Sequence, residues 1–329
     1  MRAGAVERLI TRIPDAKRCA AARSFSPHTS PSTRPVCRLY ALQATHPTRA
    51  ACELLTAQNA LLEQSEQDTR GLSNPHGWGL ASLVGGTARC VRQVKPADES
   101  ARYREQALAL EGSTLLAHIR RATVGDPSHD NTHPFRRDAA FLVHNGHVPA
   151  FDAVRPRLRD RLSRRHRETI RGTTDSEHVF ALLLQLRDEA PEAPIHVVTR
   201  RAVHLLQDWC EAAPADVHVG VSDVPFDDLD SVDDAVLHRT LALNLLWTDG
   251  TWLGGARLNR SLWALRRTAA YTCPVCGEDH TDAPEDAPYR ATVLASERIT
   301  DEDWTPVPNG SVFHVADDGR LDHYPLAPD

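Results

Sequence analysis

The sequence predicts an α+β fold in which two β-sheets are sandwiched between helices. Three observations lead to this prediction. Segments with the apolar spacing of helices and segments with the pattern of strands are interspersed along residues 37–329. Several of these strands are strongly apolar, as expected of strands buried on both faces. No linker-like stretch and no internal repeat divides the region, so we expect one domain rather than two.

The first half of this region contains most of the predicted helices. Alternation predicts a strand at 37–42, and an apolar run that ends at two glycines predicts another at 77–84. Helices are expected at 49–67, with Thr48 as its cap, and at 101–110. The apolar stretches 114–119 and 139–143 predict buried strands, joined by a loop at 125–134. Apolar residues three and four apart predict a very basic helix at 151–169 and a second helix at 176–187.

The second half continues in the same manner. A helix is expected at 194–212, followed by an acidic loop at 223–234. Strands are expected at 240–247 and 258–265, joined through Asp249-Gly250 and Gly254-Gly255, and then at 292–295 and 311–315. The Asp317-Asp318-Gly319 sequence predicts a hairpin turn.

Composition excludes several classes of protein. The 329 residues are 41% hydrophobic and 25% charged, and the net charge of −6 is spread without a clustered basic face. We therefore expect no nucleic-acid partner, and the basic helix at 151–169 fits a solvated face. No apolar run approaches the roughly 18 residues of a membrane span. Seven unevenly spaced cysteines do not indicate a disulfide framework, which favours a cytoplasmic protein.

Residues 1–36 differ from the rest. They hold seven Lys/Arg against two Asp/Glu, and they include a cluster of Ser, Thr and Pro. The segment lacks the apolar core of a secretory signal. We expect a disordered extension, which is either a pro-segment or the product of a start codon assigned too early.

Four short segments, at 37–40, 118–123, 144–146 and 174–177, suggest amide hydrolysis. This reaction needs a nucleophile, a base and donors for an oxyanion. Cys37 supplies nucleophile and base together if its own α-amine is free. Asn145 and Gly146 can donate N–H groups to the oxyanion. Arg120 can bind a carboxylate with two parallel bonds, and Asp175 can accept from an ammonium group.

Each of these residues also has an ordinary structural interpretation. Cys37 could be a small buried hydrophobe, and Arg120 could form a surface ion pair. The Asn145-Gly146 pair is a common hairpin turn signal. Asp175 or Thr174 could cap the following helix.

Taken together and in order, the motifs resemble the class II glutamine amidotransferases of the stand-alone type. The resemblance covers nearly all of residues 37–329. The segments that carry it are Cys37-Arg38-Leu39-Tyr40, Gly77-Trp78-Gly79, Ala117-His118-Ile119-Arg120, Asn131-Thr132-His133-Pro134-Phe135, His144-Asn145-Gly146 and Thr174-Asp175-Ser176-Glu177, with later matches at 244–250, 261–263 and 295–297.

The resemblance implies the four-layer αββα sandwich of N-terminal-nucleophile hydrolases, with no required cofactor. It also implies a role for each matching residue. Cys37 would be the nucleophile, with Asn145 and Gly146 as the oxyanion hole. Arg120 would bind the α-carboxylate of the substrate and Asp175 its α-amine. Thr123 and His133 would shape the glutamine pocket, and Trp78 would pack beside it.

Two features depart from the family pattern. His76 stands before Gly-Trp-Gly, where Asp is frequent. Cys37 follows Val36 in the chain, and an amide nitrogen cannot act as a base. We consider three explanations: a true start at Val36 through a GTG codon, a cleaved pro-segment, and an inactive domain that keeps the segment.

The resemblance leaves the reaction partner open. The protein could cleave the γ-amide of glutamine or a γ-glutamyl compound by itself. It could also be a subunit that passes ammonia to a separate synthase. A third alternative is a regulatory module that binds an amino acid without turnover.

The segment Cys273-Pro-Val-Cys276-Gly277, followed by His280, has the form of a zinc knuckle. Tetrahedral zinc needs four ligands, and a fourth would have to come from far along the chain, for example His238 or His314. We favour a tight turn with two free thiols and retain a structural zinc at Cys273 and Cys276 as the alternative.

Overall fold

The computed structural model describes residues 37–68, 71–122, 125–221, 234–269, 272–284 and 287–327. The predicted extension at 1–36, nearly all of the predicted acidic loop and Thr123 lie outside these residues.

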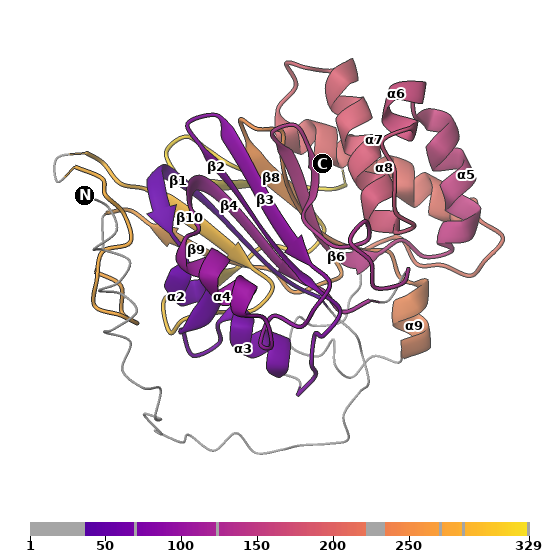
Figure 1. The fold of residues 1–329 in the computed structure, drawn as a ribbon. Helices are drawn as coiled ribbons and strands as arrows, with labels where there is room; N and C mark the ends of the chain where they lie inside the picture. Colours follow the sequence, from indigo (N-terminus) through magenta and orange to yellow (C-terminus); the bar gives the residue numbers. More distant parts are fainter. Residues whose placement is uncertain are drawn as a thin grey trace. The chain divides into compact units, whose positions relative to one another are not determined.

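The described strands form two antiparallel sheets (Figure 1). The order in the first, sheet A, is β11 (Thr305–Pro306), β9 (Trp263–Arg267), β10 (Ala291–Ala295), β1 (Arg38–Arg49), β4 (Glu111–Ile119), β2 (Trp78–Val84) and β3 (Thr87–Gln93). The order in the second, sheet B, is β13 (Leu321–Pro325), β12 (Ser311–Val315), β8 (Leu253–Leu258), β7 (Ala242–Thr248), β6 (Ala140–His147) and β5 (Phe135–Arg137).

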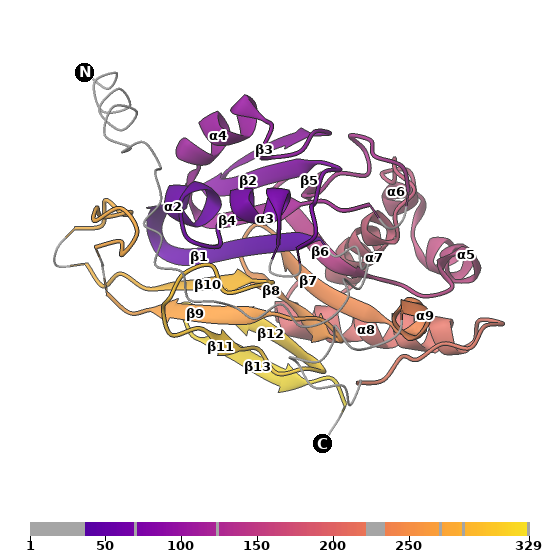
Figure 2. The same cartoon turned by 90° about the horizontal axis from the view of Figure 1, so that it is seen from below.

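The helices form two groups, one on each side of the paired sheets (Figures 1 and 2). The first group is α2 (Ala51–Leu55), α3 (Leu61–Glu66) and α4 (Ala101–Leu108). The second is α5 (Phe151–Arg161), α6 (Arg164–Arg167), α7 (Asp175–Glu189) and α8 (Ile195–Glu211), with α9 (Asp234–Arg239) preceding β7. Among the described helices, none combines the length and the apolar character that crossing a bilayer requires.

Strand alternation creates the layers. In β1, Leu39 and Ala41 belong to a core between the two sheets, whereas Tyr40 and Leu42 belong to a core beneath α2, α3 and α4. In β6, Val143 faces the other sheet and Leu142 faces the second helix group. Because successive side chains point to opposite faces, each sheet buries both faces. The result is the predicted four-layer αββα sandwich.

Three element predictions were wrong. The segment 49–67 is not one helix, because β1 continues to Arg49 and Thr48 pairs with Gly112 within it. Two short helices, α2 and α3, follow instead. The basic helix at 151–169 ends at Arg161, and α6 restarts after Ser163, whose hydroxyl accepts from the backbone N–H of His166.

The strand predicted at 258–265 combines the ends of two strands in different sheets. β8 ends at Leu258 in sheet B, and β9 begins at Trp263 in sheet A. Gly254-Gly255 lies inside β8 rather than in a connection. The sequence did not reveal that the chain crosses from sheet B to sheet A here. Both strands are buried and apolar, so the periodicity of the sequence cannot separate them.

The other elements were predicted within a few residues. β2, α4, β4, α7, α8, β10 and β12 all lie where the pattern placed them, and the turn at Asp317–Gly319 joins β12 to β13. Sequence patterns did not identify β3, whose residues are largely half-exposed, or the short strands β5 and β11.

We predict that Gly255→Ala destabilises the protein by about 3 kcal/mol, because the new Cβ would lie 1.8 Å from the Leu245 carbonyl oxygen and separate β8 from β7. Urea unfolding measures the change. Gly220→Ala is the matched control, because its Cβ would meet its nearest atom at 3.6 Å. Equal stabilities of the two variants would contradict the prediction.

Candidate active site

Cys37 directly precedes β1, an interior strand of sheet A. Its Sγ lies 3.3 Å from both the backbone nitrogen and the carbonyl oxygen of Arg121, so the sulfur accepts one hydrogen bond and donates another. Burial raises the pKa of the Cys37 thiol, and the backbone hydrogen bond from Arg121 opposes that shift. The thiol is therefore protonated at neutral pH, and it would need a base before it could act as a nucleophile.

A buried ion-pair cluster holds the residue after Cys37. The guanidinium of Arg38 lies 2.5 Å from Asp68 and 2.6 Å from Glu297, and it donates to the Cys37 carbonyl at 3.2 Å. The Ser296 hydroxyl accepts from the backbone N–H of Leu39. The motif at 295–297, from near the other end of the chain, thus packs against the start of β1.

The two-residue repeat of the strands places three predicted site residues in the same space. The core between the sheets contains Leu39, Ala41, Leu116, Phe141 and Val143. Continuing the alternation two residues at a time directs the side chains of Cys37, Arg120 and Asn145 into that space. A thiol, a guanidinium and an amide therefore approach one another from three strands in two sheets.

A small pocket opens at this point. Its lining consists of Cys37, Arg120, Arg121, His133, His144, Gly146, Thr174, Asp175 and Ser176. The structure thus brings Cys37, Arg120, His133, Gly146 and Asp175 together, with Asn145 next to Gly146 on β6.

Asn145 and Gly146 lie within β6, opposite Asn244 and Leu243 of β7. The hairpin-turn interpretation of this pair is therefore wrong. The side-chain nitrogen Nδ2 of Asn145 is buried and has no hydrogen-bond partner among the described residues. A side chain at 146 would bring its Cβ within 1.9 Å of the Ala242 carbonyl oxygen, so packing alone requires glycine there.

Thr174 and Asp175 have different structural roles at the start of α7. Thr174 is the N-cap, and its hydroxyl accepts from the backbone N–H of Glu177. The buried Asp175 carboxylate accepts from the backbone N–H groups of Val148 and Ser176, each at 2.8 Å. Asp175 therefore fastens α7 to the segment after β6 and also lines the pocket.

Arg120 is buried and supports the neighbouring loop. Its guanidinium donates to the carbonyl oxygens of Gly125 and Asp126. A substrate carboxylate bound at this group would compete with these carbonyls.

His76, the departure from the family pattern, accepts from the backbone N–H of Ala122 through Nδ1 at 2.8 Å. It thereby supplies a hydrogen-bond acceptor, as a carboxylate there would.

His118, His133 and His144 form a buried cluster beside the pocket. The rings of His118 and His133 lie 4.2 Å apart, and Nε2 of His118 donates to the His144 carbonyl at 3.2 Å. His144 Nδ1 lies 2.8 Å from the Ser176 hydroxyl. Burial lowers the pKa of all three, that of His118 to about 3, so the cluster is neutral in the folded protein.

Trp78 packs away from the pocket, in the core beneath α4, with its ring edge-on to Tyr103 at 5.2 Å. The glycines beside it allow the His133 segment to approach. A Cβ on Gly79 would lie 2.1 Å from the His133 carbonyl oxygen.

Sequence reasoning assigned no role to Arg121, Ser176, His144 or Asp68. Three of them stand within or beside the quoted motifs, which could have drawn attention to them. Asp68 had no such signal, because its link to Arg38 arises only from folding.

A comparison with family models matches residues 36–216 to the model described as glutamine amidotransferases class-II, which is more than half of the chain. The chain belongs to the class II glutamine amidotransferases. The amidotransferase is 23% identical over 312 residues to the protein described as "Probable glutamine amidotransferase DUG3" from Saccharomyces cerevisiae, an alignment that covers 85% of this chain and 82% of that protein.

Solved structures share the fold. A glutamine aminotransferase class-II domain protein from Silicibacter pomeroyi matches with a TM-score of 0.55 and 18% identity, over 89% of this chain and all of that one. Glutamine phosphoribosylpyrophosphate amidotransferase from B. subtilis matches with a TM-score of 0.54 and 13% identity, over 89% of this chain and 50% of that one. The amidotransferase therefore has the N-terminal-nucleophile hydrolase fold that the resemblance implied.

We predict that acid destabilises the protein through the buried histidines. His118 is neutral when folded down to pH about 3, but protonates near 6.5 when unfolded. Its contribution to stability is therefore present above pH 6.5 and decreases as the pH falls below that value. Each such histidine adds about 1.4 kcal/mol per pH unit to the slope.

Urea unfolding between pH 7.5 and 5 measures this slope. Below about pH 6, His118→Gln should reduce the slope by about 1.4 kcal/mol per pH unit, whatever its effect on stability at pH 7.5. The same substitution at exposed His129 is the control. An unchanged slope in His118→Gln would show that the ring titrates alike in both states.

Proposed function

We propose that the protein cleaves the side-chain amide of glutamine, or of a γ-glutamyl compound, through a thioester on Cys37. The Cys37 sulfur attacks the γ-carbonyl carbon, and the carbonyl oxygen becomes an oxyanion. The C–N bond then breaks, and the leaving amine departs with a proton. Water hydrolyses the resulting γ-glutamyl thioester, which releases glutamate and restores the thiol.

The observation that carries the proposal is the buried Nδ2 of Asn145, which has no partner among the described residues. Leaving a buried donor without an acceptor costs about 1–3 kcal/mol. An oxyanion formed between the sheets would be such an acceptor, and the strand alternation directs both Asn145 and Cys37 into that space. Gly146, which lines the pocket, would provide the second donor through its backbone N–H.

The anchors for the rest of the substrate have opposite charges. Arg120 would bind the α-carboxylate in place of the loop carbonyls that it now contacts. Asp175 would accept from the α-ammonium group. His133, neutral and on the pocket wall, would limit the width of the glutamine site. Thr123 would contribute to the same site, although it lies outside the described residues.

The raised pKa of the Cys37 thiol makes a base necessary. We infer that this base is the α-amine of Cys37, whose ordinary pKa is about 8, so the working protein must begin at Cys37. A start at Val36 with removal of its methionine would produce that terminus, and so would cleavage of a pro-segment.

The destination of the nitrogen is a separate question. A self-sufficient hydrolase would accept γ-glutamyl conjugates and release their amine. A subunit of a larger enzyme would hydrolyse glutamine slowly by itself and pass ammonia to a separate synthase. A regulatory module would bind glutamine without turnover. We favour catalysis, because the thiol and the two charged anchors line one pocket. The unsatisfied amide of Asn145 belongs to the residue before Gly146, which is part of the same lining.

We predict that residues 37–329, expressed after a removable methionine, release glutamate from glutamine or from γ-glutamyl conjugates. Cys37→Ser in the same chain is the control and should lose this activity. Mass spectrometry of the natural protein should find Cys37 at the amino terminus. Binding of glutamine without turnover in protein that begins at Cys37 would support the regulatory module and contradict the enzyme.

We predict that Asn145→Ala lowers kcat by roughly 10²–10³ with little change in KM, because an oxyanion donor acts mainly in the transition state. Asn145→Asp, which keeps the shape of the side chain and removes the N–H donor, should also lower kcat. Asn309→Ala, in the loop before β12, is the control. Unchanged turnover in Asn145→Ala would exclude this residue from the oxyanion hole.

A further inference from the structure

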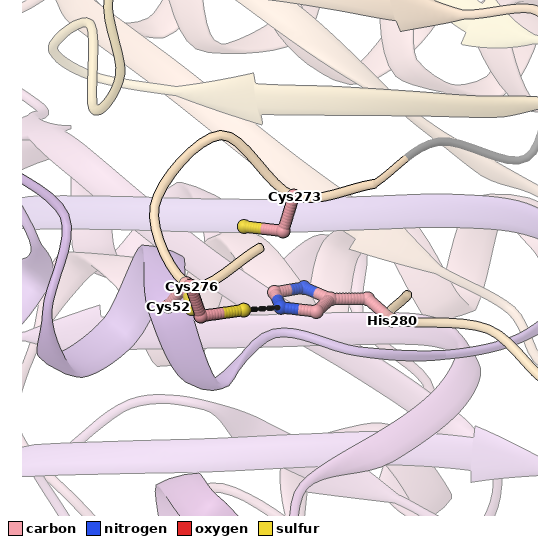
Figure 3. Close-up of side chains that lie close together, drawn as sticks. All are labelled: Cys52, Cys273, Cys276 and His280. Carbon is pink, nitrogen blue, oxygen red and sulfur yellow. Dashed lines mark hydrogen bonds between the residues drawn. The ribbon is translucent and has the colours of Figure 1, made fainter. Parts of the chain in front are cut away.

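A cluster of three cysteines and one histidine lies away from the pocket. Cys273, Cys276 and His280 belong to the segment between β9 and β10, and the structure adds Cys52 from α2 (Figure 3). One ligand atom from each residue lies within 4.8 Å of all the others. The fourth group that the sequence could not identify is thus a cysteine near the start of the described chain, not His238 or His314.

We propose that these four residues bind one Zn²⁺ ion in a tetrahedral Cys₃His site. Zn–S bonds of about 2.3 Å and Zn–N bonds of about 2.0 Å place tetrahedral ligand atoms roughly 3.5–3.8 Å apart. The Sγ of Cys276 lies 3.3 Å from Nε2 of His280. Small side-chain adjustments therefore suffice to centre an ion among the four atoms.

The backbone around Cys273 has the form of a zinc knuckle. The N–H of Gly277 donates to the Cys273 carbonyl at 2.8 Å, and the N–H of Val275 points to the Cys273 sulfur at 3.4 Å. Gly277 has φ +73°, which a glycine adopts without strain. An N–H directed at sulfur stabilises a thiolate, the form that binds metal.

The buried carboxylate of Glu53 lies beside the His280 ring. Glu53 of α2 lies with Oε2 3.8 Å from Nδ1 of His280, and Arg267 donates to its other oxygen at 3.0 Å. Oε2 of Glu53 is buried and has no hydrogen-bond partner among the described residues. Zinc-bound histidines commonly direct their second N–H to a carboxylate, which orients the ring. Binding through Nε2 would leave Nδ1–H for Glu53.

The site lies beyond the opposite end of β1 from Cys37. β1 separates the two. Its ends pair with the two ends of the nine-residue strand β4, which spans roughly 30 Å at about 3.3 Å per residue. The loop that carries the ligands already contacts this end of the strand. The N–H of Arg49 donates to the His280 carbonyl at 2.8 Å, and the Thr281 hydroxyl donates to the Pro47 carbonyl at 3.1 Å. The metal would join this loop to α2 and has no part in the amide chemistry.

Metal analysis of the full chain tests the proposal. Protein purified without chelator should contain about one zinc per chain. Cys276→Ser, which changes an exposed residue, should reduce the content at least five-fold while circular dichroism stays unchanged. Cys90→Ser is the matched control, because Cys90 is a half-buried thiol on β3 outside the cluster, and it should keep the full content.

Cobalt provides a second measurement. Reduced, metal-free protein titrated with Co²⁺ without oxygen should develop the visible bands of tetrahedral cobalt thiolate, one equivalent per chain. His280→Ala should weaken them, and His280→Cys should restore zinc binding as a Cys₄ site. Zinc-free natural protein that also gives no cobalt bands would overturn the proposal. So would a disulfide among Cys52, Cys273 and Cys276 in freshly purified protein, or equal loss of zinc in Cys90→Ser and Cys276→Ser.

Discussion

The burial of the Arg38 guanidinium is the constraint on which the position of Cys37 depends. A buried charge is stable only when its partners are in place, and removing one partner typically costs about 3–5 kcal/mol. Asp68 and Glu297 provide those partners from segments far apart in the chain. Because Arg38 also donates to the Cys37 carbonyl, the ion pairs that stabilise this end of sheet A also hold the proposed nucleophile in place.

The stacked sheets then determine what faces the sulfur. Side chains alternate along each strand, so β6 presents Phe141, Val143 and Asn145 to sheet A while Leu142 and His144 face the helices. Asn145 is the polar member of an apolar row. It follows Phe141 and Val143 of the apolar core and stands next to Gly146, which lines the pocket. A hydrogen-bond donor in such a place is desolvated before the substrate arrives, which is the condition for strong stabilisation of a developing charge.

β1 connects two different kinds of chemistry. One end carries the thiol of the proposed amide hydrolysis, and the other leads into α2 and the proposed zinc ligand Cys52. The same residue type is used differently because the surroundings differ. Cys37 has a pocket and one backbone partner, whereas Cys52 has two further thiols and an imidazole within reach. A nucleophile needs an open approach, and a structural metal site is closed on all four sides.

The sequence by itself determined the layers, the order of most elements and part of the pocket lining, namely Cys37, Arg120, His133, Gly146 and Asp175. These follow from local information: the apolar period of each strand or helix, and short motifs in which Asn145-Gly146 or Thr174-Asp175 stand side by side. Local information could not show that β1 continues through Thr48, nor that 258–265 divides between two sheets. Pairing with β4 in the first case and the crossing between sheets in the second are contacts between distant segments.

Only the tertiary structure decided which distant groups meet. Asp68 and Glu297 carry no mark that pairs them with Arg38, and Cys52 lies in a short helix with no metal motif of its own. Their proximity results from the burial of α2 and α3 against sheet A and from the return of the chain through β10. Spacing along a sequence reports neighbours within one element, whereas a buried ion pair or a four-ligand cluster depends on how elements pack.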